Sequence, residues 1–190
     1  FFDLLVGVGD REGTVRPPAH RGEIDFRVDE KGVPRPIGWV DQPGGKWQLW
    51  LHFDVEGRPP RDERYIVTAD VAAGSTDQHG RGASNSAIAV IGEMSRAKVA
   101  EYATHGLAAH KFAAVFWTAA QFFCGSEQHA YMNWDAGAAG SSMGDVIVND
   151  YDVRDNMYWR TASDGGVKAG YVRPKNPQES LRPWGGHEKM

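Results

Sequence analysis

Two apolar segments of this chain each end in an aspartate that opens into small residues. Residues 65–69 (YIVTA) run into Asp70, and a Gly- and Ser-rich loop follows. Residues 130–134 (AYMNW) run into Asp135, and glycines and alanines follow. A carboxylate at the end of a buried strand costs free energy unless something pairs with it. The repeated pattern therefore predicts two strands whose acidic ends share one cation site.

The spacing of apolar residues after Arg64 predicts a mixed α/β fold. Strands are expected at 65–71, 86–92, 98–103, 130–134 and near 157–160, with helices at 112–123 and 142–149. In the first helix apolar residues recur at steps of three and four, which indicates one buried face. A right-handed crossover would place the strand at 130–134 beside the strand at 65–71. Asp70 and Asp135 would then face each other from adjacent strand ends.

The first 62 residues differ in texture from the rest, because they are rich in Pro, Gly and charge. We expect a hairpin formed by residues 24–28 and 33–40, and a strand over 47–53 with one buried face. The predicted division is a small β-rich segment or linker at 1–62, followed by the main unit at 63–190. No structure is assigned to the tail at 174–190.

Composition limits the classes of function. At 190 residues the chain is long enough for one domain with a sizeable core. It has no apolar run of the roughly 20 residues that span a bilayer, so no membrane partner is expected. The single Cys124 excludes an internal disulfide and favours a reducing compartment. A net charge of −4 argues against strong autonomous DNA binding, although a nuclease domain delivered by another domain does not need it.

Two facing carboxylates repel each other unless a cation lies between them. Mg²⁺ and Mn²⁺ accept carboxylate and water ligands, so Asp70 and Asp135 are the candidate metal-binding and catalytic residues. An aspartate pair acting by metal-free acid–base hydrolysis, as in glycosidases, stays open as an alternative. Each aspartate alone is also typical of an ordinary turn. ATP hydrolysis is not supported, because the glycine-rich segment at 74–82 lacks the Gly-Lys-Ser/Thr ending of a P-loop.

Several segments in order resemble the C-terminal nuclease domain of tailed-phage terminase large subunits. The resemblance spans roughly residues 63–180. It is carried by YIVTADVAAG at 65–74, ASNSAIAV at 83–90, VAE at 99–101, FA at 112–113, WDAGAAG at 134–140, YWR at 158–160 and KAGY at 168–171.

This resemblance implies an RNase H-like mixed sheet with flanking helices and a metal-dependent endonuclease. Such domains cut concatemeric viral DNA during genome packaging, by two-metal phosphodiester hydrolysis with Mg²⁺ or Mn²⁺. Asp70 would be the first metal-binding acid and Asp135 the second, where the family usually has Glu. The implied partners are double-stranded DNA, the terminase ATPase domain, the small terminase subunit and the portal, in the cytoplasm of the host cell.

The third acid of that family lies downstream of the segment matched at 168–171, beyond Met190. We therefore expect an excised nuclease core that lacks one ligand and cuts weakly or not at all. Glu179 and Glu188 are not expected to replace it. The alternatives are a non-catalytic RNase H-like docking or structural module of a packaging complex, and another RNase H-like enzyme such as a transposase or integrase core.

Overall fold

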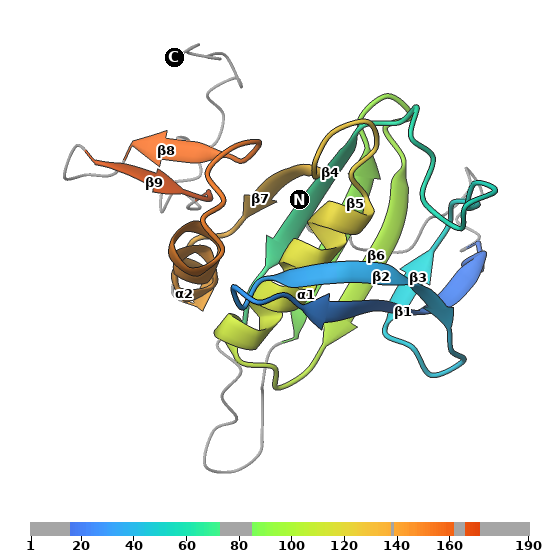
Figure 1. The fold of residues 1–190 in the computed structure, drawn as a ribbon, viewed down its shortest axis with the longest axis horizontal. Helices are drawn as coiled ribbons and strands as arrows, with labels where there is room; N and C mark the ends of the chain where they lie inside the picture. The colour runs from blue at the N-terminus through green and yellow to red at the C-terminus, as the bar shows by residue number, and fades with distance from the viewer. Residues whose placement is uncertain (1–15, 73–84, 138, 162–165, 172–190) are drawn as a thin grey trace.

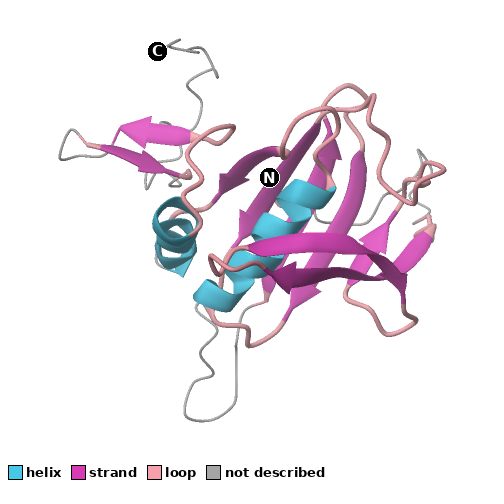
Figure 2. Ribbon diagram, in the orientation of Figure 1, coloured by secondary structure: helices cyan, strands magenta, loops and turns pink. Residues whose placement is uncertain are grey.

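The computed structural model describes residues 16–72, 85–137, 139–161 and 166–171 (Figure 1). This part of the chain is α/β, with one large, curled mixed sheet and few helices (Figure 2). The glycine-rich segment at 74–82, and the tail at 174–190 with Glu179 and Glu188, lie outside the described residues.

The elements of the described chain begin with strands, and helices and short strands follow. They are β1 (His20–Val28), β2 (Pro34–Asp41), β3 (Trp47–Leu49), β4 (Tyr65–Asp70), β5 (Ser86–Gly92), β6 (Lys98–Thr104), α1 (Ala109–Phe122), β7 (Tyr131–Trp134), α2 (Ala139–Asp145), the π-helical turn η2 (Val146–Asp150), β8 (Trp159–Thr161) and β9 (Val167–Ala169). Within these residues no helix combines the length and the apolar character needed to cross a membrane.

Seven strands form the main sheet in the order β2-β1-β3-β6-β5-β4-β7. β4, β5 and β6 pair antiparallel as a meander, and the chain then crosses through α1 to β7, which pairs parallel with β4. The predicted neighbourhood of these two strands is therefore confirmed. β3 pairs antiparallel with β6, so the β-rich N-terminal residues extend the same sheet. The division at residue 62 stays a prediction.

Helix α1 supplies the centre of the core. Phe112 and Phe116 are fully buried against the sheet, and Phe123 just beyond the helix is buried with them. On the other side, the β1–β2 hairpin curls over the helix (Figure 1), where Gln121 donates a hydrogen bond of 2.8 Å to the carbonyl of Pro34. The predicted apolar face of this helix is confirmed, but the cover provided by the hairpin was not predicted.

The turn between β1 and β2 has a local cause. Asp29 accepts hydrogen bonds from the backbone N–H groups of Lys31 and Val33, both at 2.9 Å. Gly32 adopts a φ of +81°, a left-handed conformation that glycine takes without steric cost. The predicted hairpin is therefore confirmed.

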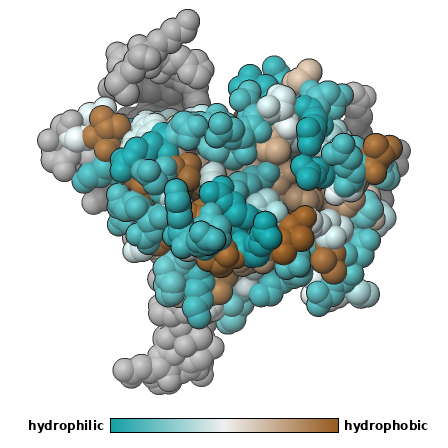
Figure 3. All heavy atoms as spheres, viewed as in Figure 1, coloured by the Kyte–Doolittle hydropathy of each residue, from teal (hydrophilic) through white to brown (hydrophobic). Residues whose placement is uncertain are grey.

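The surface of the molecule that faces the viewer in Figure 3 is mixed. Its apolar side chains are scattered among hydrophilic ones.

Two sequence predictions were wrong in extent. The strand expected over 47–53 ends at Leu49, where the ladder with β6 ends, and the last backbone hydrogen bond to β6 runs from the N–H of Trp50 to the carbonyl of Val99 at 2.8 Å. The helix expected over 142–149 begins earlier, at Ala139, and its last turn is a π-helix in which Tyr151 donates to the carbonyl of Val146 at 3.0 Å. Hydrophobic spacing does not reveal where a pairing partner ends.

Candidate functional site

The register between β4 and β7 brings the two predicted acids to the same end of the sheet. Ala69 pairs with Trp134 in the parallel ladder. One residue further, the backbone N–H of Asp135 donates a hydrogen bond of 3.0 Å to the carbonyl of Ala69. Asp70 thus ends β4 and Asp135 directly follows β7, so both lie at the carboxyl ends of two adjacent parallel strands.

Both acids lie on the sheet face opposite α1. The ring of Trp134 packs edge-on against Phe116 of α1, with ring centroids 5.9 Å apart. Because successive side chains in a strand point to opposite faces, Asp135 points away from the helix. Ala69 shares the face of its partner Trp134, so Asp70 also points away from α1. The side chains of Asp70 and Asp135 therefore share one face of the sheet.

The two carboxyl groups interact electrostatically. Desolvation raises the pKa of Asp70 above its ordinary value, and the charge of Asp135 raises it further. Asp70 remains exposed to solvent and Asp135 is half-buried, so a hydrated ion can reach both. Mutual repulsion between carboxylates is what a divalent cation relieves, and oxygen atoms are the ligands that Mg²⁺ and Mn²⁺ prefer. The residues present therefore fit a hard divalent cation.

Asp135 has a second, structural contact. Its Oδ1 atom accepts a hydrogen bond of 2.8 Å from the backbone N–H of Gly137, which orients the carboxylate. At Gly140 in the first turn of α2, an added Cβ atom would clash with the carbonyl oxygen of Asp135. The turn role that the sequence left open is thus real for Asp135. In the described part of the chain its Oδ2 atom makes no hydrogen bond that would compete with a ligand.

Aromatic residues border the outer side of β7. Tyr171 forms a parallel bridge with Asp135, in which its N–H donates to the carbonyl of Trp134 at 2.7 Å. The rings of Tyr158 and Tyr171 contact each other with centroids 6.2 Å apart. The segments before and after the β8–β9 hairpin therefore extend the sheet irregularly next to the acidic end of β7.

No third acid completes the pair within the described ranges, where no group of three or more His, Cys, Asp or Glu residues has a geometry that could hold a metal ion. Sequence reasoning missed one polar side chain, Asn133, which lies two residues before Asp135 and therefore on the same sheet face. The alternation of β7 was the signal that could have identified it.

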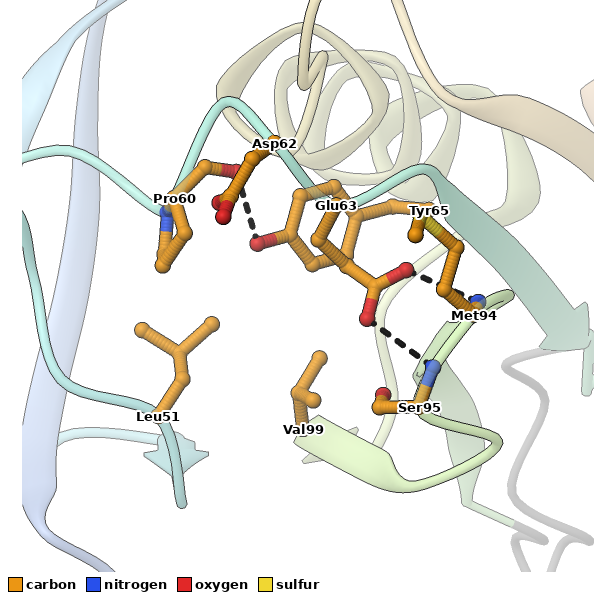
Figure 4. Close-up of a pocket in the computed structure, with 8 residues that line it drawn as sticks. All are labelled: Leu51, Pro60, Asp62, Glu63, Tyr65, Met94, Ser95 and Val99. Carbon is orange, nitrogen blue, oxygen red and sulfur yellow. Dashed lines mark hydrogen bonds between the residues drawn. The ribbon is translucent and has the colours of Figure 1, made fainter.

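A pocket of about 400 Å³ lies elsewhere (Figure 4). Tyr65 lines it and donates a hydrogen bond of 3.0 Å to the carbonyl of Pro60. Tyr65 begins β4 and Asp70 ends it, so at roughly 3.3 Å per residue the pocket is about 16 Å from the acid pair. The acid pair and this pocket are separate features.

Glu63 closes one side of this pocket by tying the β5–β6 turn to the start of β4. Its carboxylate accepts hydrogen bonds from the backbone N–H groups of Met94 at 2.9 Å and Ser95 at 3.1 Å (Figure 4), and from that of Arg64 at 3.1 Å. Burial acts to raise the pKa of the carboxyl group, but the hydrogen bonds lower it by more, so the pKa lies below its usual 4.5. The stabilisation is complete above pH 4.5 and is lost as the pH falls through the lowered pKa.

We expect Glu63→Gln to lower the free energy of unfolding at pH 7 by about 1 kcal/mol, the usual net value of such hydrogen bonds at a solvated site. At pH 3 the difference from the wild type shrinks, because protonated Glu63 is itself a neutral acceptor. Urea unfolding followed by circular dichroism at several pH values measures both. Glu30→Gln, at an exposed position, is the control and should change neither. Equal displacement of the Glu63→Gln curve at all pH values would contradict the prediction.

A search against models of known protein families finds no match for this chain, and no curated protein matches it either.

Proposed function

We propose that this chain is a metal-dependent DNA endonuclease domain of the kind found in viral genome-packaging terminases. The observation that carries the proposal is the position of Asp70 and Asp135 at the carboxyl ends of adjacent parallel strands, on one face of the sheet, where the charge of Asp135 contributes to the raised pKa of Asp70. Metal-dependent phosphodiester hydrolysis uses this chemistry, because divalent cations held by carboxylates offset charge that develops on the phosphate.

The strand order supports an RNase H-like fold for the central part of the chain. Such a fold has three consecutive antiparallel strands, then a helix, then a fourth strand that lies parallel beside the first. β4, β5, β6, α1 and β7 have this order and these directions. β3, β1 and β2 extend the sheet beyond β6.

Asp70 and Asp135 are the residues that would hold Mg²⁺ or Mn²⁺. A bound cation of this kind activates water and stabilises the leaving oxygen of the phosphodiester. The N–H of Gly137 holds the Asp135 carboxylate in one orientation, so that the Oδ2 atom is presented to the ligand. Ser86 accepts a hydrogen bond of 3.0 Å from the N–H of Ala72 and thereby fixes the chain where it leaves β4 after Asp70.

The net charge of the chain indicates how DNA would reach the acid pair. Neutralisation of phosphates by Lys and Arg supplies most of the affinity of autonomous DNA-binding proteins, whereas this chain has a net charge of −4. The proposed nuclease would therefore depend on a partner, in the terminase family the ATPase domain and the portal, to bring double-stranded DNA to the acid pair.

The test is metal dependence of plasmid nicking. We expect slow conversion of supercoiled plasmid to the open circle in millimolar Mn²⁺, its loss when EDTA is added, and its return when excess Mn²⁺ is restored. Agarose gels with a time course measure the rate. Nicking that persists in EDTA would contradict the proposal and favour metal-free hydrolysis.

A second candidate is a non-catalytic RNase H-like module that docks other parts of a packaging complex. The observation that favours it is the lack of a third acid near the pair within the described residues. Calorimetric titration with Mn²⁺ separates the two. A docking module should show no Mn²⁺ binding that depends on the Asp135 carboxylate, whereas a nuclease should lose binding in Asp135→Asn.

A further inference from the structure

Asn133 in β7 carries a buried polar atom that nothing in the fold explains. The residue is 8% exposed, and within the described residues its Oδ1 atom has no hydrogen-bond partner. A buried acceptor left unpaired costs free energy, and in a native protein it calls for an explanation such as strain, a catalytic role or a bound ligand. The rest of β7 is regularly paired with β4, so strain in the strand does not account for it.

The position of Asn133 connects it with the acid pair. Asn133 lies in β7, two residues before Asp135, so both side chains point away from α1. Its cross-strand partner in β4 is Thr68, which in turn precedes Asp70 by two residues. The pair formed by Asn133 and Thr68 is thus the next polar pair on the same face, directly before the two acids.

The other unpartnered buried polar atoms among the described residues lie elsewhere. Thr118 Oγ1 and Trp117 Nε1 belong to helix α1, and Trp134 Nε1 belongs to the ring that packs on the helix side of the sheet. Asn133 Oδ1 alone of this described set lies on the face of the acids. It is an amide oxygen, a suitable acceptor for water held by a hard cation.

We infer that Asn133 Oδ1 is the third oxygen donor of the cation site and acts through a water on the bound cation. The inference rests on the proposed function, because it assumes the cation between Asp70 and Asp135. Two residues of strand separate Asn133 from Asp135 by roughly 7 Å, whereas direct ligands of Mg²⁺ lie about 2 Å from the ion. Mg²⁺ retains several of its waters, so an outer acceptor suits it. Asn133 is thus a positioning residue for the bound water.

The experiment is calorimetric titration of the purified chain with Mn²⁺, in parallel with electron paramagnetic resonance of the free ion. Asn133→Leu and Asn133→Ala remove the acceptor, and we expect each to weaken Mn²⁺ binding about 10- to 100-fold, the usual effect of losing an outer-shell partner. Asn133→Asp keeps an oxygen in place and should bind at least as tightly as the wild type. Thr118→Val is the matched control, because it removes an unpartnered buried oxygen on the helix side, and Mn²⁺ affinity should be unchanged.

Thermal unfolding without metal separates binding from folding. Asn133→Leu should unfold at or above the wild-type temperature, since it removes a buried unpaired acceptor. If it does not fold, Asn133→Ala carries the test. Wild-type Mn²⁺ affinity in these two variants would overturn the inference and leave the nuclease proposal standing. Loss of affinity without any plasmid nicking in the wild type would support the inference and count against the nuclease. Mn²⁺ binding that Asp70→Asn does not reduce would overturn both.

Discussion

Asp70→Asn should abolish Mn²⁺-dependent plasmid nicking while the protein stays folded. We expect a fall of at least about 100-fold, because a bound cation contributes several kcal/mol to transition-state stabilisation and each 1.4 kcal/mol is tenfold in rate. Asp70 is the better of the two acids to change, because its side chain makes no hydrogen bond within the described residues, whereas the Asp135 carboxylate also accepts one from the N–H of Gly137. Nicking assays with matched protein concentrations measure the effect.

We do not expect Asp70→Asn to lower stability as it lowers activity. Desolvation and the charge of Asp135 raise the pKa of Asp70, so at pH 7 its ionised form disfavours the folded state without metal. Removing that charge should leave the unfolding free energy equal or higher. Asp25→Asn, at an exposed position in β1, is the control and should retain activity. Equal nicking by the wild type and Asp70→Asn would remove Asp70 from the mechanism.

Of the variants proposed for this chain, Phe116→Ala should lower the free energy of unfolding most. Phe116 lies in the middle of α1 and is fully buried. Its ring packs against that of Trp134, and the two ring centroids are 5.9 Å apart. Truncating a buried Phe typically lowers the free energy of unfolding by about 3–5 kcal/mol, or roughly 10 °C in Tm for a chain of this size. Because Trp134 is followed directly by Asp135, we also expect Mn²⁺ affinity to fall in the folded fraction.

Phe26→Ala is the matched control for this prediction. Phe26 lies in β1 and is 37% exposed, so its truncation should lower the unfolding free energy by about 1 kcal/mol or less. Thermal and urea unfolding followed by circular dichroism measure both variants. Similar losses in the two would show that α1 is not the centre of the core.

Local pattern was sufficient for the central elements. The strand predicted at 86–92 coincides with β5, and the strand predicted at 65–71 differs from β4 by one residue. The helix followed from apolar residues at three- and four-residue steps, because an amphipathic helix needs little more than one buried face. Ends that depend on a distant partner were less predictable, as the early end of β3 at Leu49 shows.

The candidate site was also predictable from the sequence only in part. The sequence predicts that Asp70 and Asp135 each come at the end of an apolar strand. Their proximity followed from one expected crossover between neighbouring strands. The sequence did not predict the hydrogen bond that orients Asp135 or the burial of the unpaired Asn133 oxygen. Both depend on which surfaces lie against β7 after the chain has folded.

The sequence alone therefore determined which segments are strands or helix and which acids stand at strand ends, because side-chain periodicity and turn residues act over a few positions. The tertiary structure decided that the N-terminal strands join the same sheet through β3 and β6, that the β1–β2 hairpin covers α1, and that the N–H of Gly137 orients the Asp135 carboxylate. The first two of these features arise from pairing register and packing between residues far apart in the chain, which local spacing does not encode.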